Sequence, residues 1–476
     1  MEQIDTLSQS SAILLTLTVS ITFVIVGIIY STKYKGLDNY LVANRSIGTF
    51  SLTSSLVASA LGAWILFGPA SAATWGGIGA VIGYALGTAF PLFILIFLGT
   101  KFRKNFPKGK TLIEIIRKKL GNKLFKLTLF LSVFYMTIFL IAEVTAVSLL
   151  INYISGTKLW ITAFIVISSS LIYTLYGGLR ASIFTDNIQF VIIVLLLLIS
   201  FSYLISFNAN EFNFEFIGNK KPMLLSSSYI PNFTAGLTFF IAVAATNLFH
   251  QGNWQRVYAA KNNKVLKNSL MISFLIIIPI VFFMGFSGLV AVSSNSNVIP
   301  DLAFFQLLLK DQVATISVII IILAISLTVS SIDTLINAIS SLIIVDGNKI
   351  IKNNKNYLLL SKQIIILLSI VAFFVASKGI SILYLFLLAD LFCCAAVLSI
   401  FYSFYSKLLN EKNTYISIIV GLTAGLLLFP SPDFSRSILI GIIFPTDFFP
   451  SIISQSLLFF SFLVATFLPV VTWKLK

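Results

Sequence analysis

Apolar runs of about 20 residues follow one another along almost the whole of this 476-residue chain. A helix needs about 20 apolar residues to cross the hydrocarbon core of a bilayer, so each run predicts a membrane span. Hydrophobic residues make up 58% of the chain and charged residues only 10%, which excludes an ordinary soluble domain. We expect about thirteen spans, at residues 11–30, 47–70, 74–100, 126–151, 159–177, 184–206, 234–252, 268–294, 312–345, 360–377, 380–405, 413–430 and 451–474.

The connections between these spans are short, and the longest cover residues 101–125, 207–233 and 346–359. None is long enough for an enzyme domain, and no Gly-rich phosphate loop with its lysine is present. The chain has one histidine and two adjacent cysteines inside an apolar run, which exclude a histidine-based metal centre and a disulfide framework. We therefore expect neither an enzyme nor a carrier that itself uses ATP.

The net charge of +16 is distributed unevenly over the connections. If the connection after the first span is cytoplasmic, 26 of the 32 Lys and Arg residues are cytoplasmic and 6 are external. The positive-inside rule then predicts an external N-terminus and a cytoplasmic C-terminus. The basic excess is explained by this topology and by contact with lipid headgroups, and we expect no nucleic acid partner.

Two of the expected spans are poor helices in corresponding places. The second contains Gly62 and Gly68-Pro69, and the seventh contains Gly236, Thr246 and Asn247. Broken helices in matching positions of two halves indicate the midplane binding site of a secondary transporter. Spans two to six would then form one five-helix repeat, and spans seven to eleven an inverted copy. This prediction rests on hydropathy, because no repeat is visible residue by residue.

The ninth span carries a row of polar side chains. Ser330, Asp333, Thr334, Asn337 and Ser341 are three or four residues apart, which places them on one helical face. A carboxylate in the middle of a bilayer costs at least roughly 2.5 kcal/mol, so this face should meet a partner or a wet cavity. Oxygen ligands suit a hard cation, and the face is therefore a candidate ion site.

Several separated segments together resemble the sodium:solute symporter family, which includes bacterial carriers for proline, sugars and sialic acid. They are residues 36–45, 63–68, 176–186 with Gln189, 255–261, and the polar face that begins at Ser330 and ends near Asp346. The resemblance implies an all-α polytopic membrane protein of about thirteen transmembrane helices, with a leucine-transporter-type inverted repeat, in a bacterial cytoplasmic membrane. The expected divisions are an N-terminal part (1–46), a first repeat (47–206), an extracellular loop (207–233), a second repeat (234–405) and two C-terminal helices (406–476).

The resemblance also implies a principal sodium site, with Na⁺ as the coupling ion. Its ligands would be the backbone carbonyls of Ala58, Leu61 and Leu327 and the hydroxyls of Ser330 and Ser331. Carbonyls and hydroxyls can replace the hydration shell of sodium without adding a full charge. In the alternative interpretation, the two serines only bond back to helix carbonyls.

Some relatives have a second cation position, which corresponds here to Asp186, Asp333 and Thr334. The acid at 333 is a departure, because those relatives more often have a small hydroxyl residue there. Two carboxylates repel unless a cation or a proton lies between them, so Asp333 predicts a second cation site or a protonatable group. The alternatives are a helix cap for Asp186, since Thr185-Asp186 begins the sixth span, and a structural hydrogen bond for Asp333.

The solute is expected between the second and seventh spans. The candidates for contact with it are Trp64, Phe67, Phe139, Glu143, Thr246 and Asn247. Glu143, inside the fourth span, suits an amine or a proton, or else bonds to a backbone amide or hydroxyl. The role of Asp390, in the eleventh span, is open between the same alternatives. Sugar-carrying relatives have a gating tyrosine where this chain has Thr246, which argues against a stacked hexose.

The segment after the seventh span carries Gln255, Arg256 and Lys261. We expect it to be a cytoplasmic anchor near the inner gate, or alternatively a solvated loop. The expected function is sodium-coupled symport of a small organic solute by alternating access, for an amino acid such as proline or another nitrogen-containing solute. A proton-coupled carrier and a transporter-like sensor are the alternatives. The expected partners are the solute, sodium and membrane lipid, with no obligate protein partner.

Overall fold

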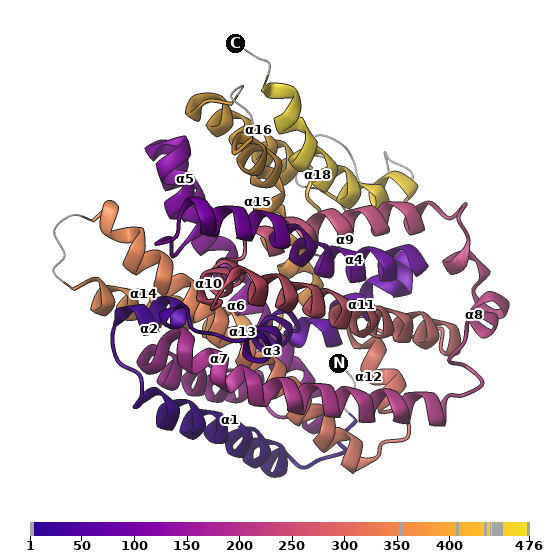
Figure 1. Cartoon of the computed structure of the whole chain (residues 1–476). Helices are drawn as coiled ribbons and strands as arrows, with labels where there is room; N and C mark the ends of the chain where they lie inside the picture. Colours follow the sequence, from indigo (N-terminus) through magenta and orange to yellow (C-terminus); the bar gives the residue numbers. More distant parts are fainter. Residues whose placement is uncertain are drawn as a thin grey trace.

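The computed structural model describes residues 4–351, 356–405, 409–432, 436, 437, 439 and 451–473. Within these residues the regular structure is helical (Figure 1), and the only β-type pairing is in isolated bridges. Nine of these helices are long and apolar enough to cross a membrane. The predicted all-α fold is confirmed, and each of the thirteen expected spans falls largely on helix.

The helices are α1 (Gln9–Ser31), α2 (Leu37–Val42), α3 (Thr49–Ala60), α4 (Gly68–Asn105), α5 (Leu112–Leu120), α6 (Asn122–Ser155), α7 (Leu159–Phe207), α8 (Phe214–Lys220), α9 (Ile230–Phe249), α10 (Gln251–Ala259), α11 (Asn263–Ser294), α12 (Ala303–Leu308), α13 (Ala314–Val345), α14 (Tyr357–Ala376), α15 (Ile382–Ser403), α16 (Glu411–Leu428) and α18 (Ser451–Thr472). Short 3₁₀ segments are η1 (Ala43–Arg45), η2 (Ala63–Leu66), η3 (Pro222–Leu225), η4 (Pro300–Leu302) and η5 (Gly347–Lys349).

Two helices are longer than the sequence predicts. α4 contains the end of the second expected span and all of the third, and α7 contains both the fifth and the sixth. Each bends at one glycine with a positive φ, which is 59° at Gly77 and 62° at Gly178. Only glycine adopts these angles readily, so a single residue makes each turn: Gly178 lies in an expected connection, whereas Gly77 lies just inside the third expected span.

The first broken helix is interrupted where the sequence predicts. α3 ends at Ala60, Leu61 leaves the helical region (φ −94°, ψ 76°), and α4 begins at Gly68 with Pro69 in its first turn. The second break is not at the expected residues, because Gly236, Thr246 and Asn247 lie inside regular α9. The helix ends instead at Phe249, and His250 accepts the Gly252 N–H to cap α10.

The two broken helices lie in the middle of the bundle. The backbone of Ile47, just before α3, pairs in parallel with the end of α10 through hydrogen bonds to Ala259 (3.1 Å) and Lys261 (2.9 Å). α4 packs along both α9 and α11, while α13 packs on α3, α6 and α7 (Figure 1). The close approach of α4 to α9 needs glycine, since a Cβ at Gly83 would lie 2.2 Å from a backbone oxygen of α9.

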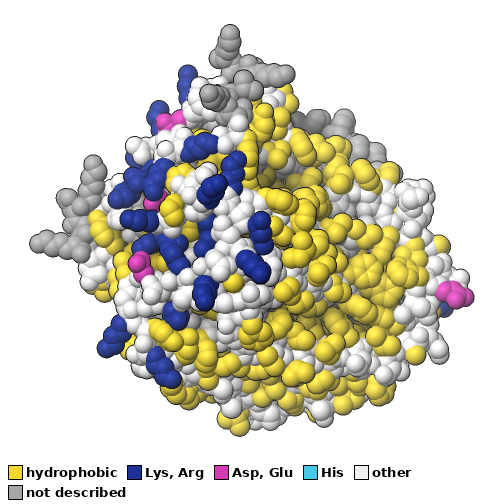
Figure 2. Space-filling model, viewed as in Figure 1, with side chains coloured by type: hydrophobic (Ala, Val, Ile, Leu, Met, Phe, Trp, Pro, Cys, Tyr) yellow, Lys and Arg dark blue, Asp and Glu magenta, His cyan; other side chains and the backbone are white. Residues whose placement is uncertain are grey.

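Apolar and basic side chains occupy different parts of the surface. In Figure 2, apolar side chains cover most of the face in view, and Lys and Arg side chains gather at the end where Figure 1 places α2 and α5. An apolar surface of this extent suits a protein that lies in lipid. Five lysines that the charge count includes lie outside the described residues: Lys352, Lys355, Lys407, Lys474 and Lys476.

Candidate ion and solute sites

The residues expected to bind the first sodium ion come from two elements that are in contact. Ala58 and Leu61 lie at the end of α3, and Leu327, Ser330 and Ser331 lie in the middle of α13, which packs on α3 and η2. All five residues are buried. Because α3 ends at Ala60, the carbonyls of its last turn lack the partners that a continuing helix would provide.

The two serines of this group differ in their bonding. The Ser330 hydroxyl donates to Asp186 Oδ1 at 2.6 Å. The buried Ser331 hydroxyl has no hydrogen-bond partner among the described residues. The alternative that both serines bond back to helix carbonyls is therefore wrong. Other buried hydroxyls are also unpaired, such as those of Thr53 and Thr328, but Ser331 lies beside the helix break, where its hydroxyl fits a cation site made of carbonyl and hydroxyl oxygens.

Asp186 lies in a buried cluster that joins four helices. Its carboxylate accepts hydrogen bonds from Ser55 (2.5 Å), Ser330 (2.6 Å) and the guanidinium of Arg256 (2.9 Å). Arg256 also donates to Ser55 (2.7 Å) and to Thr334 (2.9 Å). Asp186 is not a helix cap, because α7 runs past it from Leu159 to Phe207.

Arg256 is not part of a solvated loop. Its side chain is 0% exposed, and neighbouring Gln255 is 1% exposed, whereas Lys261 is exposed. The reason is the break at His250, which turns α10 back into the bundle against α13. The buried guanidinium thus faces the Asp186 carboxylate, and each charge satisfies the other.

Asp333 belongs to a neighbouring group of side chains. It accepts hydrogen bonds from Tyr173 (2.6 Å), Ser182 (2.9 Å) and Thr185 (3.3 Å), all on α7. Thr334 links the two groups, because its hydroxyl contacts both Asp333 (3.3 Å) and Arg256 (2.9 Å). The structural hydrogen bond that we considered for Asp333 is present. The region nevertheless contains two carboxyl groups and one guanidinium.

A cavity lies beside the first break and encloses about 620 Å³ of space that no atom fills, its open mouth included. Five of the expected solute contacts line it, whereas Phe67 packs instead against Phe305, with ring centroids 4.8 Å apart. The lining residues are Ser59, Ala60, Trp64, Tyr84, Phe139, Glu143, Val243, Thr246, Asn247, His250, Asn253, Ser331, Leu335, Phe386 and Asp390.

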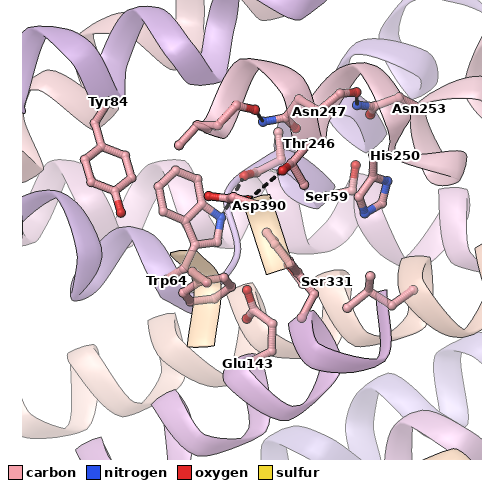
Figure 3. A pocket seen from close by; sticks show the side chains of 15 residues that line it. Ser59, Trp64, Tyr84, Glu143, Thr246, Asn247, His250, Asn253, Ser331 and Asp390 are labelled. Carbon is pink, nitrogen blue, oxygen red and sulfur yellow. Dashed lines mark hydrogen bonds between the residues drawn. The ribbon is translucent and has the colours of Figure 1, made fainter. Parts of the chain in front are cut away.

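Two carboxylic acids reach this cavity from different helices (Figure 3). Glu143, on α6, accepts the backbone N–H of Ala63 at 2.8 Å, directly after the break. Asp390, on α15, accepts the hydroxyl of Thr246 at 2.6 Å. Ser331 also lines the cavity, so the candidate sodium site and the solute cavity share a wall.

Residues 40–421 match the model of the sodium:solute symporter family. The chain belongs to this family. The resemblance in the sequence motifs is thereby confirmed, and the protein is a multi-pass membrane protein of a transporter family.

Several curated proteins are similar to this family member. One is named "Spermidine transporter DUR31", from Candida albicans, which is 26% identical over 79% of this chain and 71% of its own length. "Sodium/glucose cotransporter 1" of Ovis aries is 30% identical over 35% of this chain, and the match spans about a quarter (25%) of that protein. "Probable urea active transporter 1" of Schizosaccharomyces pombe is 26% identical over 35% of this chain and 25% of its own length.

The fold is also that of solved carriers. A substrate-bound, outward-open Na⁺-coupled sialic acid symporter superposes with a TM-score of 0.70 at 17% identity, covering 97% of this chain and 96% of that one. The nucleobase-cation-symport transporter Mhp1, in a closed conformation, superposes with a TM-score of 0.53 at 13% identity, covering 91% and 93%. The predicted leucine-transporter-type fold is confirmed.

Some residues of these sites were not foreseen. Tyr84, Asn253 and Phe386 line the cavity without any signal in the sequence that sets them apart from other apolar-run residues. Ser55 and Arg256 complete the Asp186 cluster. A partner for Asp186 was to be expected, because a carboxylate buried in a bilayer needs one, but the sequence does not single out Arg256 among the 32 Lys and Arg residues.

Proposed function

We propose that this protein is a sodium-coupled secondary active symporter that imports a small nitrogen-containing organic solute by alternating access. The observation that supports this most is the unpaired Ser331 hydroxyl, which lies between the break after α3 and the cavity. Carbonyls of Ala58, Leu61 and Leu327 and the hydroxyls of Ser330 and Ser331 would hold the ion. Sodium entry supplies about 2.3 kcal/mol per charge per 100 mV of membrane potential, in addition to its concentration gradient.

The proposed coupling follows from the shared wall. Ser331 belongs to both the ion site and the cavity, and Glu143 contacts the backbone of the break. An ion bound between α13 and the break would hold these two elements together. It would therefore fix the positions of Ala63 and Glu143, beside which the solute binds. The ion would thus raise the affinity for the solute, and the solute would raise the affinity for the ion by the same factor.

The proposed orientation places the basic end of the molecule in the cytoplasm. The Lys and Arg side chains gathered near α2 and α5 in Figure 2 support this orientation through the positive-inside rule. Solute and sodium would then enter from the opposite end, near η4 and α12, and leave toward α5 and α10.

The names of the relatives support a nitrogen-bearing solute more than a sugar. The Candida albicans protein, which matches most of this chain, is named for spermidine, and the Schizosaccharomyces pombe protein is named for urea. The matches to the urea transporter and to the glucose cotransporter each cover only about a third of this chain (35%), so the spermidine transporter carries most of this support. In addition, the hydroxyl of Thr246, where a stacking tyrosine was considered, is already bonded to Asp390.

Removal of the Ser331 hydroxyl tests the sodium site. We expect Ser331→Ala to raise the sodium concentration for half-maximal uptake at least tenfold, because one oxygen ligand worth about 1.5 kcal/mol is lost. Uptake into proteoliposomes, with sodium varied against choline, measures this change. Ser369→Ala is the matched control, since that serine is also buried and unpaired but lies on α14. Equal sodium dependence in both variants would contradict the assignment.

A proton-coupled carrier is the second candidate, and the observation in its favour is Asp333. Two carboxyl groups, Asp186 and Asp333, face one guanidinium, so one negative charge has no fixed counterpart there. We expect Asp333→Asn to keep sodium-driven uptake when no pH gradient is imposed. Uptake driven by a pH gradient without sodium, and lost in Asp333→Asn, would instead establish proton coupling.

Counterflow of labelled solute would exclude the remaining alternative, a sensor that does not transport.

A further inference from the structure

The cavity beside the first break is acidic. Glu143 and Asp390 line it, and no Lys or Arg is among the described residues that do. His250 adds no charge in this arrangement, because its Nδ1 accepts the Gly252 N–H at 3.1 Å and therefore carries a lone pair. Carboxylates removed from water need a positive partner or a proton, so the cavity favours an occupant that supplies one and disfavours an anionic one.

One backbone N–H at the break is not available to a carboxylate of the solute. The N–H groups that begin the second half of a broken helix attract anionic groups of a substrate. In this protein α4 begins only at Gly68, and the N–H of Ala63, which starts the 3₁₀ segment η2 directly after the break, already donates to Glu143 at 2.8 Å. A carboxylate of the chain itself thus takes one N–H group at the break that the carboxylate of an amino acid would otherwise use.

The walls between the acids are aromatic. Trp64 donates its indole N–H to the Ala60 carbonyl at 3.1 Å, which leaves the ring face as its contact with the cavity. It stacks on Tyr84 (centroids 5.9 Å apart) and meets the edge of Phe386 (6.5 Å). Phe386 also contacts Phe139 at 4.7 Å. Aromatic faces attract ammonium groups and also pack against an alkyl chain.

We propose that the solute of this cavity is an aliphatic organic cation without a carboxylate, with Glu143 and Asp390 as anchors for its ammonium groups. Each carboxylate offers about four acceptor positions, so the bonds to Ala63 and Thr246 leave room for an ammonium donor. Since the two acids come from α6 and α15, a diamine suits the cavity better than a monoamine (Figure 3). The proposal deepens the proposed function and rests on it.

Thermal stability of the purified full-length protein in detergent tests the solute class. The probes are 1,4-diaminobutane, 1-aminobutane, proline, glucose and urea, each with sodium and with choline. We expect 1,4-diaminobutane to raise the melting temperature most, and to do so more strongly in sodium. Stabilisation by proline, glucose or urea without stabilisation by the diamine would overturn the proposal.

The two anchors are tested by variants that keep shape and remove charge. We expect Glu143→Gln and Asp390→Asn each to raise the Kd for 1,4-diaminobutane at least tenfold. Asp346→Asn is the matched control, because that buried acid also accepts a threonine hydroxyl at 2.6 Å, from Thr111, but lies outside the cavity. Retained stabilisation of Asp390→Asn by sodium shows that the variant is folded. Unchanged diamine affinity in both anchor variants would overturn the proposal.

The two proposals fail in different ways. Diamine binding that is equal in sodium and choline, and lost in Glu143→Gln and Asp390→Asn, would overturn sodium coupling and support the cation site. Sodium-dependent binding of a zwitterion or a sugar, with no diamine binding, would overturn the cation site and support sodium coupling.

Discussion

Replacement of Arg256 by alanine is expected to lower the free energy of unfolding by about 3–5 kcal/mol, because it leaves a buried carboxylate without its partner. The guanidinium and the Asp186 carboxylate are both 0% exposed and lie 2.9 Å apart. Arg256 also bonds to Ser55 and Thr334, so its loss leaves polar groups of α3 and α13 unpaired. Unfolding by heat or detergent titration, followed by tryptophan fluorescence, measures the change.

A second ion pair in the same protein provides the control. Lys110 and Asp38 lie 2.6 Å apart, but the Asp38 side chain is 64% exposed. Lys110→Ala should therefore cost less than about 1 kcal/mol. The double variant Asp186→Asn/Arg256→Gln should be more stable than Arg256→Ala, since no charge is then left alone. An Arg256→Ala protein as stable as Lys110→Ala would show that the buried pair does not hold these helices together.

The fold was predictable because lipid offers no hydrogen-bond partners to the backbone. Within a bilayer every N–H and C=O must be bonded inside the protein, so a run of about 20 apolar residues forms a helix. The break near Gly62 was also visible, because Gly62 and Gly68-Pro69 interrupt an otherwise apolar run. The sequence did not show that Gly77 and Gly178 make the turns, since many other glycines in these spans lie in regular helix.

The ion and solute sites were predictable only in part. Ser331, Trp64 and Glu143 were expected near the break, and the structure places all three around the cavity. Arg256 was expected outside the membrane, because hydropathy assigns a charged residue to a connection and cannot show that α10 turns inward. The partners of Asp333 depend on how α13 is rotated against α7, which no pattern along one helix specifies.

The replacement Gly62→Ala is expected to abolish uptake, to less than about one hundredth of the wild-type rate, without unfolding the protein. A Cβ at this position would lie 2.1 Å from Glu143 Oε1 and 2.6 Å from Ser331 Oγ. Both atoms are ends of side chains, so they can move and the helices can still pack. The movement would, however, displace the acid proposed to hold the solute and the hydroxyl proposed to hold sodium. A loss of two such contacts, at about 1.4 kcal/mol for each factor of ten, gives a hundredfold effect.

Gly48→Ala is the matched control for this prediction, because Gly48 begins the same broken helix and a Cβ there would meet nothing within 4 Å. Its uptake should stay near the wild-type rate, and both variants should melt within a few degrees of the wild-type protein. Adding Glu143→Ala to Gly62→Ala removes the closest clash but leaves the one with Ser331, so both stabilisation by sodium and solute binding should stay reduced in the double variant. Normal uptake by Gly62→Ala would mean that Glu143 and Ser331 do not need to approach the break this closely, and the proposed coupling between ion and solute would lose its structural basis.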